Sequence, residues 1–185
     1  MPIKFLPSIA TFLAALVLMT ASPARADDQV IEPFVGHYKG QSISGITDET
    51  ADRLFDVWIR NADNAAFEVE WTTTSTKTDG RIKEKSYRIA FKKTGRPGIF
   101  ASAQRRDMFG NDVPFDPMKG DPYVWSRLVG PTLTVFAMSI TEQGGYDMQV
   151  YERTLTDGGL AFVFMRHLDG IPMKSVTGHL QRMEE

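Results

Sequence analysis

The stretch AAFEVEWTTT, residues 65–74, alternates apolar and polar side chains with a period of two. Three apolar side chains share one parity: Phe67, Val69 and Trp71. Glu68 and Glu70 occupy the opposite parity. Successive side chains of an extended strand point to opposite faces, so this pattern predicts a strand with one buried and one solvated face.

Similar segments recur along the chain, rich in aromatic and β-branched residues and separated by Gly, Asp, Asn or Pro. They predict strands at residues 34–43, 53–60, 65–74, 81–93, 99–104, 123–129, 133–141, 146–155, 160–168 and 173–183. Only residues 47–54 suit a single helical turn. About ten strands joined in sequence predict an all-β protein with one antiparallel up-and-down barrel, because closure removes exposed sheet edges. A β-sandwich is the alternative.

The first 26 residues have the layout of a secretory signal. Lys4 supplies the positive start, residues 9–19 the apolar run, and ARA at residues 24–26 the small-x-small cleavage site. The apolar run is shorter than the ~20 residues that span a bilayer. We therefore expect cleavage before Asp27, export to the periplasm or the exterior, and no stable membrane insertion afterwards.

Residues 27–185 then form a single domain with a net charge of −4, since cleavage removes two of the 21 basic residues and none of the 23 acidic ones. This charge offers no electrostatic footprint for a nucleic-acid partner. The chain contains no Cys, which excludes disulfides and thiolate chemistry. A protein partner is not identifiable from the sequence.

The two ends of the predicted barrel, GHYKG at residues 36–40 and GHLQR at residues 178–182, resemble the ends of lipocalin-like (calycin-type) barrels. In that family a Gly-x-Trp on the first strand lies against an Arg from the last strand. The resemblance implies that Tyr38 and Arg182 form the barrel-closing pair, with Tyr in place of Trp. It implies a fold and no particular function.

Nitrobindin-like haem barrels also resemble this chain, because they carry an iron-ligating His on the last strand, where His179 stands here. Haem binding through His179 is therefore a minor alternative. However, the apolar parity of that strand includes Val176 and Leu180, which predicts that His179 faces outward.

No pattern in the chain commits it to a reaction. There is no Gly-x-Ser-x-Gly nucleophile elbow, and no carboxylate pattern frames His37, His167 and His179 as metal ligands. Glu68 and Glu70 belong to a solvated outer face rather than to an acid/base pair. We therefore expect a non-enzymatic protein without metal or cofactor.

Two charged residues of the hairpin at residues 146–168, Glu152 and Arg166, lie among apolar neighbours, and the turn at residues 157–159 decides which of them faces the lumen. With a two-residue turn Tyr151 pairs with Phe164, whereas with a three-residue turn Glu152 does. Either register places a polar group among aromatic ones, as a pocket for a ligand head requires. A buried structural hydrogen-bond network is the alternative reading.

Residues 105–122 interrupt the strand pattern, because three prolines and two glycines prevent regular pairing. The segment also carries four soft or aromatic side chains: Met108, Phe109, Phe115 and Met118. A loop of this length suits a lid over a pocket, and a surface loop packed on the barrel rim is the alternative.

These observations favour an exported binding protein that takes a small, mostly apolar ligand in the lumen. The alternatives are a solid barrel acting as an envelope interaction or stability module, and an enzyme acting on a hydrophobic substrate. The predicted pocket and lid residues are Trp71, Tyr87, Phe91, Met108, Phe109, Phe115, Tyr151, Glu152, Phe164 and Arg166.

Overall fold

A computed structural model describes residues 31–45, 50–63, 66–103, 105–106, 112–113 and 115–184 of the chain. The signal-like segment at residues 1–26 lies outside the described residues, as do Met108 and Phe109.

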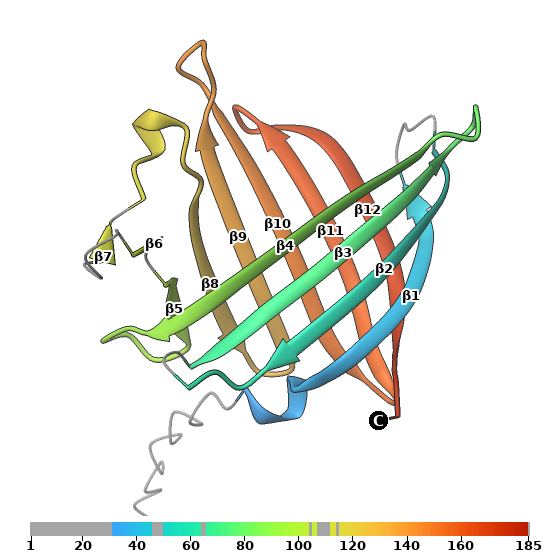
Figure 1. Ribbon diagram of the computed structural model, residues 1–185, viewed down its shortest axis with the longest axis horizontal. Coiled ribbons are helices and arrows are strands. Elements are labelled where there is room, and N and C mark those ends of the chain that lie inside the picture. The colour runs from blue at the N-terminus through green and yellow to red at the C-terminus, as the bar shows by residue number, and fades with distance from the viewer. Residues whose placement is uncertain are drawn as a thin grey trace, which may run out of the picture.

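Ten antiparallel strands close into a barrel, in which consecutive barrel strands pair along the chain and the first strand pairs with the last (Figure 1). The barrel strands are β1 (Gly36–Gly45), β2 (Thr50–Arg60), β3 (Phe67–Lys77), β4 (Ile82–Lys93), β5 (Ile99–Ser102), β8 (Tyr123–Val129), β9 (Thr132–Ile140), β10 (Tyr146–Thr156), β11 (Gly159–Leu168) and β12 (Ile171–Arg182). The predicted barrel is therefore confirmed, and the sandwich is not found.

The period-two pattern of β3 sorts its side chains as predicted. Val69 and Trp71 are buried inside the barrel at 0% and 5% exposure. Glu70 lies on the outer face and accepts hydrogen bonds from Arg60 of β2 and Arg88 of β4. These cross-strand ion pairs cover the outside of the hairpin while the apolar parity fills the inside.

Pairing between β1 and β12 closes the ring, with Tyr38 opposite Arg182. Gly40 allows the two strands to approach, because a Cβ at this position would overlap the carbonyl oxygen of His179. A short 3-10 helix, η1 (Glu32–Phe34), precedes β1 and covers this end of the barrel with the buried ring of Phe34.

The hairpin of β10 and β11 has a two-residue turn at Asp157-Gly158, and Gly158 adopts a φ of 81° that favours glycine. Tyr151 accordingly pairs with Phe164, as the shorter of the two predicted turns requires. Glu152 pairs with Val163 on the outer parity.

Two segments differ from the prediction. Residues 50–54, expected in a helical turn, belong to β2, because Arg53 continues the inward parity of that strand. The irregular loop contains a small two-stranded sheet of β6 (Arg105–Arg106) and β7 (Asp112–Val113), followed by the 3-10 helix η2 (Pro117–Lys119). In Figure 1 these elements lie outside the ring of barrel strands, and η2 contacts β9.

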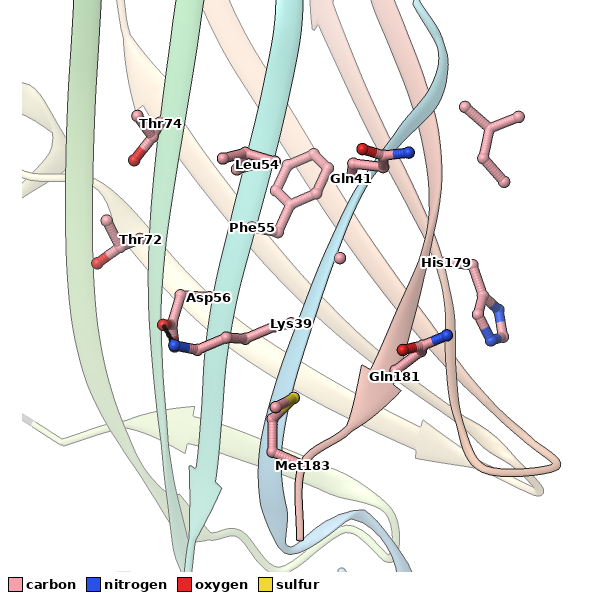
Figure 2. Close-up of a pocket in the computed structure, with 12 residues that line it drawn as sticks. Lys39, Gln41, Leu54, Phe55, Asp56, Thr72, Thr74, His179, Gln181 and Met183 are labelled. Atoms are coloured by element: carbon pink, nitrogen blue, oxygen red, sulfur yellow. Dashed lines mark ion pairs between the residues drawn. The ribbon is translucent and has the colours of Figure 1, made fainter.

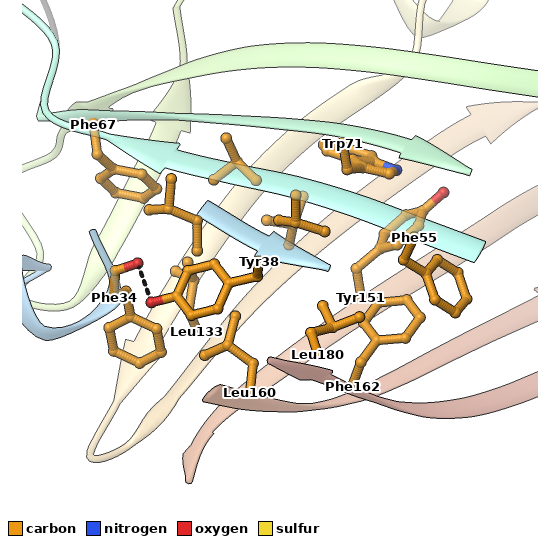
Figure 3. Close-up of a cluster of buried hydrophobic side chains, with 14 of the residues drawn as sticks. Phe34, Tyr38, Phe55, Phe67, Trp71, Leu133, Tyr151, Leu160, Phe162 and Leu180 are labelled. Atoms are coloured by element: carbon orange, nitrogen blue, oxygen red, sulfur yellow. Dashed lines mark hydrogen bonds between the residues drawn. The ribbon is translucent and has the colours of Figure 1, made fainter. Parts of the chain in front are cut away.

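Large apolar side chains fill the end of the barrel next to η1 (Figure 3). The fully buried ones include Phe34, Tyr38, Phe67, Phe91, Ile59, Leu128, Leu133, Leu160 and Leu180. Phe67 stacks on Phe91 and meets Phe100 edge-on, with ring centroids 5.1 and 5.0 Å away. Buried apolar side chains therefore occupy this half of the lumen. No helix among the described residues is long and apolar enough to cross a membrane.

Candidate functional site

Two hollows could receive a ligand, and the larger lies on the outer wall of β1, β2, β3 and β12. Its volume is about 690 Å³. Side chains of the outward parity line it, among them Leu54, Thr72 and His179 (Figure 2). Leu54 is 48% exposed, so this hollow is an open groove in the sheet surface rather than an enclosed pocket.

The charged groups of this outer groove already neutralise one another. Asp56 pairs with Lys39 at 3.1 Å and with the Nε2 of His37 at 2.8 Å. Partial burial raises the pKa of Asp56, but the hydrogen bonds from His37 and Lys39 outweigh it and the net pKa is lowered. His37 also stacks on Trp58, with ring centroids 3.7 Å apart. The groove therefore offers a ligand no uncompensated charge.

The second hollow is the open half of the lumen, with a volume of about 390 Å³. Pockets for small organic ligands start at roughly 300 Å³. The lining side chains are those of Arg53, Phe55, Trp71, Thr73, Ser75, Lys77, Lys83, Lys85, Tyr87, Gln149, Tyr151, Phe162, Phe164, Arg166, Lys174 and Val176. They come from β2, β3, β4, β10, β11 and β12 and share the inward parity, so the pleat of each strand aims them at one space.

Aromatic rings form the floor of this cavity. Tyr151 lies at the centre, with ring centroids 5.1 Å from Trp71 and 4.9 Å from Phe164. Phe55 and Phe162 add a further pair at 4.8 Å. Figure 3 shows that this layer lies beyond Tyr38 and Leu160, on the side away from η1. The floor therefore presents ring faces and edges to an apolar group.

Polar side chains on one wall are already oriented. Tyr151 donates its hydroxyl hydrogen to the amide oxygen of Gln149 at 2.8 Å, and burial raises the pKa of Tyr151. The Nε of Arg166 donates to Asp147 at 2.9 Å, a contact that raises the pKa of Arg166. Because the Asp147 side chain is only 11% exposed, the pair holds Arg166 at the mouth in a defined position.

Basic side chains dominate the mouth. Among the described residues that line the cavity six are basic and none is acidic. Lys83 and Lys85 of β4 lie opposite Ser75 and Thr73 of β3. Arg53 donates its Nε hydrogen to the hydroxyl of Ser75 at 3.1 Å. The whole chain has a formal charge of −2, so its composition does not predict this local cluster of positive charge at the mouth.

Arg153 of β10 lies one layer below the aromatic floor and is fully buried. Its guanidinium carbon lies 5.3 Å from the ring centroid of Trp71, 5.9 Å from that of Tyr151 and 5.8 Å from that of Phe162. None of its three nitrogens has a hydrogen-bond partner among the described residues. Burial lowers the pKa of Arg153 to about 10, so the group stays protonated at neutral pH.

Five of the predicted pocket residues line the cavity: Trp71, Tyr87, Tyr151, Phe164 and Arg166. Their role in binding stays a prediction. Phe91 and Glu152 do not line it. Phe91 is fully buried in the packed half, whereas Glu152 takes the outer parity that the two-residue turn imposes.

None of residues 115–122, the part of the loop whose side chains the structure describes, lines the cavity. Met118 is 80% exposed, and Phe115 is half-buried. A role for these two residues in covering the pocket stays a prediction.

The residues missed at the sequence level are the basic ones, above all Lys83, Lys85 and Arg153. A signal was available, since Lys83 and Lys85 share the parity of Tyr87, Ile89 and Phe91. The alternation of β4 thus continues into the mouth with basic side chains on the inner face.

His179 lies exposed on the outer face, as predicted, and so cannot ligate a haem inside the lumen. Within the described ranges no group of three or more His, Cys, Asp or Glu side chains is arranged to hold a metal ion. No protein-family model matches the sequence, and no curated protein matches it either.

Proposed function

We propose that this protein is an exported, non-enzymatic binding protein of the lipocalin-like kind, which holds a small, mostly apolar ligand in the open half of its barrel. The observation that carries the proposal is the lumen cavity of about 390 Å³ above an aromatic floor. Burial of a ligand's apolar surface there contributes roughly 25 cal/mol per Å². The cluster of buried apolar side chains on one side of the cavity supports that floor before the ligand arrives.

The test uses the neutral fluorescent probe N-phenyl-1-naphthylamine. We expect saturable binding with one-to-one stoichiometry and energy transfer from Trp71, which forms part of the floor. Probe binding without saturation, or no binding of this and other apolar probes of different size, would contradict the proposal. Either result would favour the alternative of a solid barrel that acts as an envelope interaction or stability module.

Two neighbouring threonines supply matched variants that separate the two hollows. Thr73 lines the lumen cavity, whereas Thr72 lines the outer groove. We expect Thr73→Trp to fill the lumen and abolish binding, and Thr72→Trp to leave it unchanged. Circular dichroism checks that both variants keep the fold. The opposite result would move the binding site to the outer groove.

A further inference from the structure

The mouth of the barrel reverses the usual distribution of side chains. On β4 the inner parity carries Lys83 and Lys85, while Ile82 on the outer parity is 71% exposed. On β2 the inner residue is Arg53 and its outer neighbour Leu54 is 48% exposed. Solvation alone would favour the opposite arrangement, because water covers the outside of the barrel more fully than the inside.

The same reversal occurs across the mouth on β12, where Lys174 lines the cavity and Met173 is 49% exposed on the outside. Three strands therefore direct cations toward the cavity, where Arg53 is buried while Lys83 and Lys85 remain exposed to solvent. Neither Lys83 nor Lys85 has an ion-pair partner among the described residues. Asp147, a carboxylate beside the mouth, is already held by Arg166.

Arg153 adds positive charge from below. Its three nitrogens lack hydrogen-bond partners among the described residues, and its nearest described neighbours include three rings of the cavity floor. In this low-dielectric setting an uncompensated guanidinium attracts anions and repels cations more strongly than it would in water. The region below the floor and the mouth of the cavity thus both carry positive charge.

We propose that the ligand is an amphipathic organic anion, whose apolar body rests on the ring floor and whose acidic group is held at the mouth by Lys83 and Lys85. This inference rests on the proposed function and names its ligand class. An acidic group at the mouth keeps partial contact with water, while the apolar body occupies the drier part of the cavity. The reverse orientation would place an apolar end among the lysines.

The test compares two probes that differ by one sulfonate, 8-anilinonaphthalene-1-sulfonate and the neutral N-phenyl-1-naphthylamine. We expect the sulfonate to bind about tenfold more tightly at low salt, because charge-assisted hydrogen bonds to lysines add to the same apolar contact. We also expect this preference to shrink as the salt concentration rises.

The double variant Lys83→Gln/Lys85→Gln should weaken binding of the sulfonate much more than binding of the neutral probe, and so remove most of the preference. A matched control, Lys93→Gln/Arg96→Gln, removes two exposed charges at the other end of β4 and in the following turn, and should keep the preference. Circular dichroism and a denaturant titration check that both variants fold.

The outcomes separate this inference from the function on which it rests. If neither probe binds, the proposed function fails. If both bind with equal affinity, or if the control variant loses the preference as well, the lumen still binds ligands but the inference is overturned. Competition with decanoate, decyl phosphate and decanol gives a second check: displacement by either anion supports the inference and identifies the preferred head group, whereas equal displacement by decanol overturns it.

Discussion

Arg182 donates a hydrogen bond of 2.6 Å to the hydroxyl of Tyr38, and its guanidinium carbon lies 5.1 Å from the centroid of the Tyr38 ring. The same guanidinium donates to the carbonyl oxygens of Pro33 and Val35 at 2.6 and 2.8 Å. The last strand is thus tied both to the first strand and to η1. This is the contact that the resemblance to lipocalin-like barrels implied.

The Tyr38 hydroxyl is a direct test of this arrangement. Tyr38→Phe removes the hydrogen bond from Arg182 and the bond of 2.8 Å that Tyr38 donates to the Phe34 carbonyl. We expect a loss of about 1–3 kcal/mol in the free energy of unfolding. Tyr87→Phe, at the half-exposed mouth, serves as the control and should change it by less than about 0.5 kcal/mol. Equal effects in urea titrations would show that the closing contact is dispensable.

The two faces of β3 should respond unequally to truncation. Trp71→Ala removes a buried ring and should cost about 3–5 kcal/mol. Glu70→Ala removes only partly exposed ion pairs and should cost about 1 kcal/mol or less. The measurement is chemical denaturation of both variants, and similar costs would contradict the observed orientation of this strand.

Arg153 should be expendable for stability but not for anion binding. Desolvation of a buried cation costs several kcal/mol, more than cation–π contacts of about 0.5–2 kcal/mol each are sure to return. We expect Arg153→Met to leave the free energy of unfolding unchanged or to raise it by up to about 4 kcal/mol, and to weaken binding of the anionic probe.

Arg166→Met is the matched comparison for Arg153, because it deletes a second inward arginine of the same hairpin. It leaves the mostly buried Asp147 carboxylate without its observed partner and should destabilise the fold by about 1–3 kcal/mol. A loss of stability in Arg153→Met as large as this would show that Arg153 has a structural role instead.

The lowered pKa of Asp56 predicts that the free energy of unfolding depends on pH in the acid range. Its pKa in the folded protein is lowered from 3.8, so its contribution is fully present above that value and is lost as pH falls through the lower folded pKa. We expect the difference in unfolding free energy between the wild type and Asp56→Asn to shrink as pH is reduced below about 4. A difference that stays constant from pH 6 to pH 2 would contradict this.

Export predicts a defined start of the mature chain. We expect expression in a Gram-negative host to yield periplasmic protein beginning at Asp27, because ARA at residues 24–26 has the small-x-small pattern of a signal cleavage site. N-terminal sequencing or intact mass gives the answer. Full-length protein in the membrane pellet would be the contrary result.

The sequence predicts the barrel well because period-two alternation depends only on which face is buried. Phe67, Val69 and Trp71 follow this rule, and so the ten strands and their inward residues could be found. The face of the sheet on which Glu152 lies could not be decided from this alternation alone. Its orientation depends on whether the following turn has two or three residues, and one residue of slip reverses a strand's faces.

The candidate site was only half predictable. Aromatic residues such as Trp71 and Tyr151 can be assigned to the barrel interior from their alternation. A lysine on the inner face goes against that hydrophobic pattern, so the sequence does not predict the lysines of the mouth. The burial of Arg153 without a partner depends on which side chains surround it in space, and this cannot be read from one strand. The course of residues 105–122 is likewise hidden, because prolines exclude pairing without specifying where a loop lies.

Pairing of β1 with β12 also shapes how the chain must fold. Tyr38 and Arg182 are 144 residues apart, whereas every other pairing in the barrel joins barrel strands that follow one another along the chain, with the small β6–β7 sheet between β5 and β8. The local hairpins can therefore form at low loop-closure entropy, and only the final junction brings together the two ends of a long loop. Before that junction forms, β1 and β12 are free edges open to other chains, so a refolding protein is most prone to aggregate just before the ring closes.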